Sequence, residues 1–106
     1  MNGVENAIED NIFMARIAEQ GERYQDMVDF LKMVIEQKGA DMSTDERSLL
    51  SIAFKNVVAP KRTAWRTVIS VQNNHKHFVY QASILEYRQK LEDAIFNDCS
   101  NIIAMI

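Results

Sequence analysis

The 106 residues are the length of one small domain, and 47% hydrophobic with 25% charged residues is ordinary for a folded globular protein. Three glycines, one proline and one cysteine argue against a turn-rich all-β domain, an intrachain disulfide and a zinc site built on cysteines. The formal net charge of −3 argues against a nucleic-acid binder, which usually has a basic surface.

This charge is unevenly distributed along the chain. Residues 1–46 carry 11 acids and 4 bases, a balance of −7, and residues 86–106 have a balance of −2. Between them, residues 47–85 carry 6 bases and no acid. This acid-free stretch of 39 residues in an acidic chain is the first functional indication in the sequence.

The first half of the chain predicts two helices. Apolar residues at helical spacing cover about residues 6–20, where they form two stripes, and Gly21 then interrupts the pattern. Two stripes on one short helix predict contacts on two sides, one of them intermolecular. A second amphipathic pattern covers about residues 23–38 and ends at Gly39, which can adopt a left-handed cap conformation.

Two longer helices are predicted in the second half. Ser43 and Glu46 have the spacing of a capping box, so a third helix begins there, and its apolar positions run to about residue 72. Pro60 lies inside this pattern and is expected to kink the helix, because proline lacks a backbone donor. A polar loop at 73–77 precedes a fourth helix over 78–106. The predicted fold is an all-α antiparallel array of four helices.

Three cations on the third helix are the most informative constellation. At 100° per residue, Arg62 and Arg66 both return to within about 20° of Lys55, along a stripe roughly 16 Å long. Arginine offers phosphate a planar fork and lysine offers a point charge. The stripe therefore fits a phosphate group, and the alternative is a merely solvated helix face.

Other chemistry has weaker support. A helical nucleic-acid binder is a third reading, but no aromatic residues are interleaved with the cations. His75 and His77 lack a third ligand at a suitable spacing, so they are expected to be solvent-exposed, with no metal or other cofactor. Cys99 is expected to be a small core residue, because no histidine is placed to activate it. No motif supports catalysis.

The N-terminal residues lack the basic and apolar regions of a signal peptide. No apolar run approaches the roughly 20 residues needed to span a bilayer. We therefore expect a soluble, cytoplasmic protein that has neither a membrane nor a nucleic acid as its partner. The chain stops on an apolar helical pattern, Ile102–Ile106, that contains no stop signal.

Three stretches of the chain resemble the 14-3-3 family. They read AEQGERYQDM over residues 18–27, RSLLSIAFKNV followed by KRTAWR over residues 47–66, and EYR over residues 86–88. The corresponding family segments are AEQ-x-ERY, RNLLS-V-AYKNV, RR-x-xWR and EYR. The matches are in the same order and cover essentially the whole chain.

The resemblance implies the N-terminal four-helix portion of a longer adaptor that binds phosphoserine or phosphothreonine motifs and is not an enzyme. Lys55 and Arg62 match two phosphate-contacting cations of the family, and Arg66 matches a nearby basic position in the groove. Family members are more than twice as long, so residues 1–106 are expected to hold the dimerisation region and half of the phosphopeptide site. The alternative is a dimerisation or scaffold fragment that binds no peptide on its own.

The resemblance also implies a dimer, formed either with a second copy or with a related chain. The matching interface positions are Ile17, Gly21, Arg23 and Asp26 on the first two helices, and Ala64, Val68, Val71, Tyr87 and Lys90 on the others. Asp26 and Lys90 match an intersubunit ion pair, whereas the acidic partner position of Arg23 is occupied here by Ala94. Exposed ion pairs contribute about 0–1 kcal/mol each, so apolar contacts are expected to dominate.

Several positions depart from the family pattern. Phe54 replaces a tyrosine and loses its hydroxyl, and Ser48 replaces an asparagine. Lys61 keeps the charge of an arginine without its fork, and Pro60 is expected to change the direction of Arg62 relative to Lys55. These differences predict a divergent member with an altered peptide preference.

Overall fold

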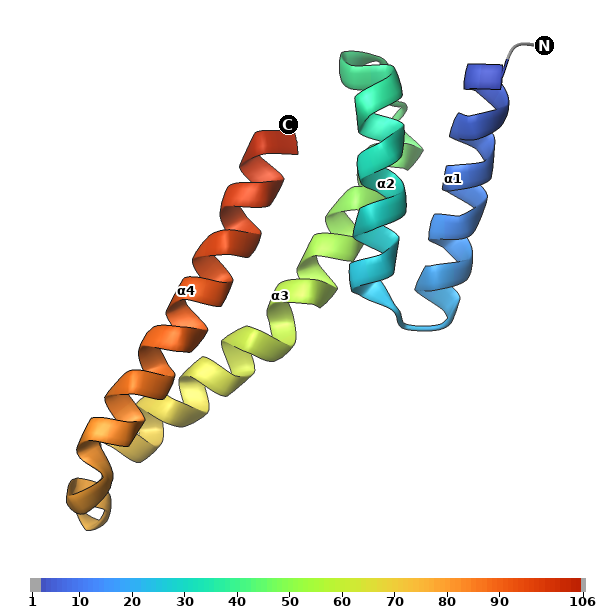
Figure 1. The fold of residues 1–106 in the computed structure, drawn as a ribbon. Helices are drawn as coiled ribbons and strands as arrows, with labels where there is room; N and C mark the ends of the chain where they lie inside the picture. Colours follow the sequence, from blue (N-terminus) through green and yellow to red (C-terminus); the bar gives the residue numbers. More distant parts are fainter. Residues whose placement is uncertain (1–2, 106) are drawn as a thin grey trace. The chain divides into compact units, whose positions relative to one another are not determined.

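A computed structural model describes residues 3–105, which form four α-helices and two short 3₁₀ helices (Figure 1). In chain order these are α1 (Gly3–Gln20), α2 (Tyr24–Lys38), η1 (Gly39–Asp41), α3 (Thr44–Gln72), η2 (His75–Tyr80) and α4 (Gln81–Met105). The described residues contain no strand. The all-α prediction with four helices is confirmed.

The chain divides into two compact units, and each is described separately below. The first unit extends to Val57, and the second runs from Val58 to Ala104. Helix α3 contributes its first half to one unit and its second half to the other. Pro60 lies inside α3 as the sequence predicts.

The first unit contains the better-developed hydrophobic core. Helices α1 and α2 pack against each other, and the start of α3 contributes a third set of buried side chains. The buried positions recur every three or four residues on each helix, some of them as adjacent pairs, as expected for one apolar face. They are Ala15 and Ala18 on α1, Met27, Val28, Leu31 and Val34 on α2, and Leu49, Leu50, Ala53 and Phe54 on α3.

The end of α1 at Gln20 agrees with the predicted break at Gly21. The helix stops before Gly21, but the residue with a positive φ is Glu22, at 56°. The backbone N–H of Arg23 donates to the carbonyl of Ala18 at 2.8 Å, and that of Glu22 donates to Glu19 at 3.0 Å. This pair of bonds is a Schellman motif, in which the first residue after the helix cap has the left-handed conformation. Here that residue is Glu22. Its register puts that conformation one residue after the glycine.

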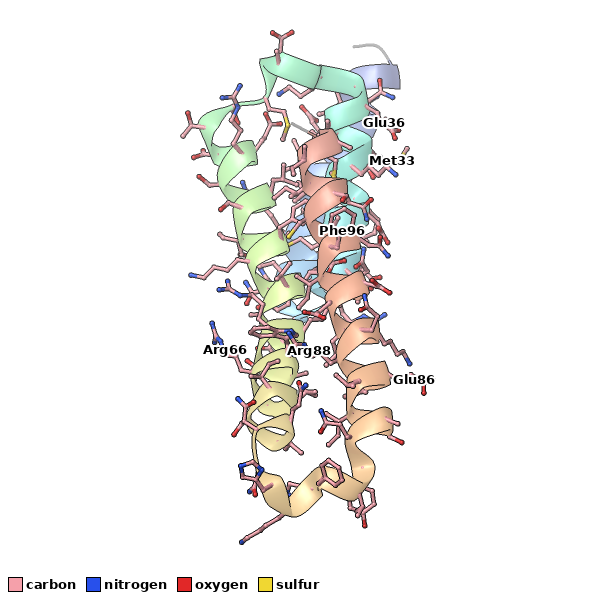
Figure 2. All side chains as sticks on the ribbon, turned by 90° about the vertical axis from the view of Figure 1, so that its left-hand side faces the viewer. Met33, Glu36, Arg66, Glu86, Arg88 and Phe96 are labelled. Carbon is pink, nitrogen blue, oxygen red and sulfur yellow. The ribbon has the colours of Figure 1, made fainter. Side chains whose placement is uncertain are left out.

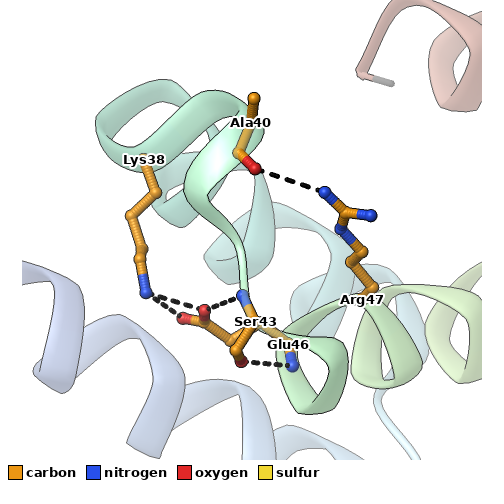
Figure 3. A network of polar contacts seen from close by, with 5 residues as sticks. All are labelled: Lys38, Ala40, Ser43, Glu46 and Arg47. Atoms are coloured by element: carbon orange, nitrogen blue, oxygen red, sulfur yellow. Dashed lines mark hydrogen bonds and ion pairs between the residues drawn. The ribbon is translucent and has the colours of Figure 1, made fainter.

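The capping box at the start of α3 is confirmed (Figure 3). The Ser43 hydroxyl accepts from the backbone N–H of Glu46 at 3.1 Å, and the Glu46 carboxylate accepts from the N–H of Ser43 at 2.7 Å. Lys38, at the end of α2, also donates to both oxygens of Glu46, at 2.7 and 3.0 Å. These bonds join the two helix ends across η1. Gly39, which opens η1, has a φ of 55° and a ψ of −123°, a combination that favours glycine.

In the second unit, side-chain bonds join α4 to the second half of α3. Lys61 bonds Asp98, Trp65 bonds Glu92, and Arg88 bonds Gln72. Val68 is the one hydrophobic side chain of this unit that is buried within the described residues. Helix α4 begins at Gln81, later than the predicted 78, because residues 78–80 complete a 3₁₀ helix.

Candidate functional site

The three cations of the predicted stripe are all exposed on α3. Lys55 belongs to the first unit, and Arg62 and Arg66 belong to the second. Arg62 and Arg66 are four residues apart, so they share one face of their part of α3. Figure 2 shows Arg66 projecting outward from α3, on the side away from α4. No ion pair involves these three side chains among the described residues, so an anion can reach them.

Lys61 has a different role from the neighbouring cations. Its ammonium lies 2.5 Å from Oδ2 of Asp98, and the two side chains are 35% and 13% exposed. Lys61 is therefore engaged in a half-buried ion pair between α3 and α4. The sequence analysis described Lys61 as keeping the charge of a family arginine. In the structure this charge pairs with Asp98 and so joins α3 to α4.

A second polar network lies on the same two helices. The Glu92 carboxylate accepts from Trp65 Nε1 at 3.2 Å and lies 3.5 Å from Arg88 Nε. Arg88 also donates to Gln72 Oε1 at 2.9 Å. Figure 2 shows Arg88 between the two helices, which is consistent with its bonds to both. This network fixes the position of Trp65, which lies four residues after Lys61.

An open groove of about 510 Å³ runs along the second unit. It is lined mainly by apolar side chains, with one cation and one carboxylate: Val58, Arg62, Trp65, Glu92, Ile95, Phe96 and Cys99. Cys99 is exposed, so the prediction of a core cysteine is wrong. The reason is that Cys99 lines this open groove, which the helix pair of the second unit leaves accessible to solvent.

The histidines and other potential metal ligands do not cluster. His75 is exposed as predicted, whereas His77 is half-buried. Within residues 3–105, no group of three or more histidine, cysteine or carboxylate side chains could hold a metal ion. We therefore find no geometric support for a metal site in this part of the chain.

The residues predicted for a dimer face differ in exposure. Ile17 is 44% exposed and Tyr87 is 49% exposed, which is high for large apolar side chains in a folded protein. Gly21, Arg23 and Lys90 are also exposed, and Ala64 and Val71 are half-buried. Val68 is buried within the chain itself, so it has little side-chain area left for a partner.

The charged pair at the start of α2 is satisfied within one chain. Arg23 Nε donates to Oδ2 of Asp26 at 2.9 Å, and these side chains are 75% and 46% exposed. This local bond was not anticipated from the sequence, where each residue was assigned to an intersubunit pair. Its i, i+3 spacing on a helix was the available signal.

Comparison with known proteins identifies the family. The sequence model of the 14-3-3 protein family matches residues 14–106. The chain belongs to the 14-3-3 family. It is 36% identical over its whole length to the 14-3-3-like protein GF14-F of Oryza sativa subsp. japonica, and 36% identical to the 14-3-3-like protein A of Hordeum vulgare. It is 39% identical to the 14-3-3 protein 6 of Solanum lycopersicum over 92% of its length.

The chain covers only part of these 14-3-3 relatives. It spans 42% of the rice and barley proteins and 40% of the tomato protein. The structural findings above therefore concern a portion of the family's length. Among the described residues, no helix has the length and apolar character needed to cross a membrane.

Proposed function

We propose that this chain supplies the N-terminal part of a dimeric, non-enzymatic adaptor that binds phosphoserine or phosphothreonine motifs of partner proteins. In this proposal Lys55, Arg62 and Arg66 hold the phosphate, and the protein acts in the cytoplasm. The observation that carries the proposal is the exposure of all three cations on α3, in a stretch that matches the 14-3-3 family.

The charges around the cations favour an anionic ligand. Residues 47–85 contain no acid, so no carboxylate on α3 beyond its first turn competes with a phosphate. Glu92 of α4 lines the groove with Arg62, but its carboxylate already has Trp65 and Arg88 as partners. Lys61 is held by Asp98, which leaves Arg62 as the adjacent free guanidinium. A guanidinium forms two parallel bonds to a phosphate, and each hydrogen bond to a charged group contributes about 1.5–3 kcal/mol.

The proposal is best tested in a chimera, because the relatives are longer than this chain. Residues 1–106 would replace the corresponding segment of the tomato 14-3-3 protein 6, which supplies the remaining part of that protein. Titration with a fluorescent phosphoserine peptide should give saturable binding, and the unphosphorylated peptide should not bind. Lys55→Glu and Arg62→Glu should each weaken the affinity at least about tenfold, which corresponds to ~1.4 kcal/mol.

The control replaces an exposed lysine outside the proposed site. Lys32 on α2 is exposed and changes the net charge by the same amount when replaced by glutamate. Lys32→Glu should leave peptide affinity unchanged. If the chimera is folded by circular dichroism and Lys55→Glu binds the phosphopeptide as tightly as the parent, the assignment of the phosphate site is refuted.

A dimerisation or scaffold fragment without peptide binding is the second candidate. It is favoured by the exposed apolar side chains at positions that match the family's dimer face, above all Ile17 and Tyr87. Light scattering on the chain alone, with and without a phosphopeptide, separates the two candidates. A dimer that does not bind the phosphopeptide supports the scaffold candidate. Binding of the phosphopeptide by the isolated chain supports a phosphate site that functions without the remaining part of the longer relatives.

A further inference from the structure

The connection between α3 and α4 exposes an unusual run of apolar side chains. Phe78, Val79 and Tyr80 are 76%, 80% and 61% exposed, and they follow one another in η2 (His75–Tyr80). We call η2 the tip of the second unit, because it joins the ends of the two helices (Figure 1). Isolated exposed apolar residues need no explanation, but three consecutive ones form a patch that water solvates poorly.

Hydrogen bonds within the tip and at its two ends satisfy several of its backbone N–H and carbonyl groups. Asn74 caps η2, since its side-chain oxygen accepts from the N–H of Lys76 at 3.0 Å. The N–H of His77 donates to the carbonyl of Asn74 at 3.1 Å, and that of Gln81 donates to Phe78. An apolar environment strongly penalises unsatisfied backbone groups. The internal bonds therefore lower the cost of placing this segment in such an environment.

The geometry of η2 directs its apolar side chains to all sides. A 3₁₀ helix has 3.0 residues per turn, so Phe78, Val79 and Tyr80 are about 120° apart around its axis. A flat protein surface would contact one face of such a segment. A lipid layer is a continuous apolar medium, so a tip that projects into it has all three side chains covered at once.

The charged residues beside the tip favour an anionic lipid. Lys76 and the two flanking histidines are the ionisable residues of η2 besides Tyr80, and no carboxylate lies between positions 47 and 85. The nearest acid after the tip is Glu86, which Figure 2 shows projecting from α4. Lysine beside an apolar wedge is attracted by anionic headgroups, while a tyrosine ring suits the boundary between headgroups and acyl chains.

We infer that the tip His75–Tyr80 is a membrane-surface contact that inserts Phe78, Val79 and Tyr80 into the headgroup boundary of an anionic lipid layer. The chain lies on this surface and does not span it. The inference is independent of the proposed phosphopeptide site, and it differs from the sequence-based expectation of no membrane partner. That expectation rested on the lack of a signal peptide and of an apolar run long enough to span a bilayer, and neither criterion detects a short segment that lies on a membrane surface.

The test is co-sedimentation of the 106-residue chain with two kinds of vesicle. One is phosphatidylcholine alone, and the other contains about one-third phosphatidylserine. We expect binding to the anionic vesicles that weakens as salt is added, because surface charge is screened. The triple variant Phe78→Ser, Val79→Ser, Tyr80→Ser should lose at least about tenfold in apparent affinity, and Lys76→Glu should lose severalfold on the anionic vesicles.

Two matched variants control for general effects of hydrophobicity and charge. Ile103 on α4 is 69% exposed, so Ile103→Ser removes a comparable apolar side chain away from the tip. Lys32→Glu makes the same charge change on α2 as Lys76→Glu makes on the tip. Both controls should bind like the parent chain. Phe78→Trp should in addition give a blue-shifted fluorescence on anionic vesicles, beyond any change of Trp65 in the parent chain.

Three results would overturn the inference. The first is sedimentation of the triple variant equal to that of the parent. The second is an equal loss in Ile103→Ser, which would mean that any exposed apolar residue contributes. The third is no binding to either vesicle, which would leave a protein partner as the occupant of the tip.

Discussion

Lys61 and Asp98 join α3 to α4 through an ion pair with a distance of 2.5 Å between Nζ and Oδ2. The two residues are 37 positions apart in the sequence. Asp98 is largely shielded from water, so its charge depends on the lysine for compensation. The pair therefore contributes to the stability of the second unit, where few apolar side chains are buried.

We predict that Asp98→Asn lowers the free energy of unfolding by about 1–2 kcal/mol, because it leaves Lys61 without its carboxylate partner. The measurement is urea denaturation followed by circular dichroism. Asp93→Asn is the control, since Asp93 is an exposed acid on the same helix. Equal stabilities of Asp98→Asn and the parent would contradict the prediction.

Substitutions at Lys61 and Arg62 should distinguish a cation with a structural role from a cation that binds the proposed ligand. In the chimera with the tomato relative, Lys61→Met should lower stability but change phosphopeptide affinity less than about twofold. Arg62→Met, one residue further, should weaken affinity at least about tenfold and leave stability nearly unchanged, because Arg62 is exposed. The opposite pattern would mean that Lys61 contacts the phosphate.

Local sequence signals predicted most of the helices. The second helix ends and the third begins close to the predicted residues, because Gly39 and the pair Ser43 and Glu46 act through contacts only a few residues apart. The start of α4 was less predictable. The apolar residues at 78–80 extend the helical spacing of α4, although the backbone there adopts a 3₁₀ turn capped by Asn74.

Features that depend on packing were not predictable from spacing. The partner of Lys61 is set by which faces of α3 and α4 meet, and no local pattern specifies that register. The exposure of Cys99 likewise depends on how many helices surround α4. The three candidate phosphate cations were predicted as a helix stripe, and the structure places all three on the surface of α3.

Glu46 should give the first unit a stability that depends on pH. The Glu46 side chain is 7% exposed, and this burial acts to raise its pKa. Burial is the largest single influence, but the hydrogen bonds from Lys38 and Ser43 and the charge of Lys38 together outweigh it, so the pKa lies below its ordinary value of 4.5. Because the folded pKa is lowered, the stabilisation is complete above about pH 4.5 and is lost as the pH falls through the folded value.

We therefore expect Glu46→Gln to destabilise the chain at pH 7 and to reduce the loss of stability on acidification. The expected cost at pH 7 is about 1–3 kcal/mol, since Lys38 and the N–H of Ser43 lose a charged acceptor. Urea unfolding between pH 3.5 and 7 measures both effects. Asp45→Asn removes an exposed acid from the same helix turn and should have a smaller effect. A pH profile of Glu46→Gln that parallels the parent would refute this role.

The left-handed residue at the end of α1 offers a stabilising substitution. Glu22 has a φ of 56°, a conformation in which a side chain costs roughly 1 kcal/mol relative to glycine. Glu22→Gly should raise the free energy of unfolding by about 0.5–1 kcal/mol, as measured by urea denaturation. Glu19→Gly, inside the last turn of α1, should instead lower stability by about 1 kcal/mol. A loss of stability in Glu22→Gly would show that the Schellman geometry is not maintained in solution.

The proposed dimer should depend on apolar contacts more than on ion pairs. Ile17 and Tyr87 are exposed in one chain, so a partner can bury both, and an aspartate at position 17 would place an unpaired charge in that contact. Asp26 already has Arg23 as its partner, and an exposed pair contributes at most about 1 kcal/mol. We predict that Ile17→Asp raises the dimer dissociation constant at least tenfold, and that Asp26→Asn raises it less than about fivefold.

Sedimentation equilibrium at micromolar concentrations measures both constants. Met33 on α2 is 46% exposed, close to the 44% of Ile17, but it lies outside the proposed dimer face. Figure 2 shows Met33 projecting from α2. Met33→Asp therefore introduces the same charge at equal exposure and should leave the dimer unchanged. A parent chain that remains monomeric would contradict the dimer. Equal effects of Ile17→Asp and Met33→Asp on the dissociation constant would show that Ile17 is not in the interface, because only a specific contact makes position 17 more sensitive than position 33.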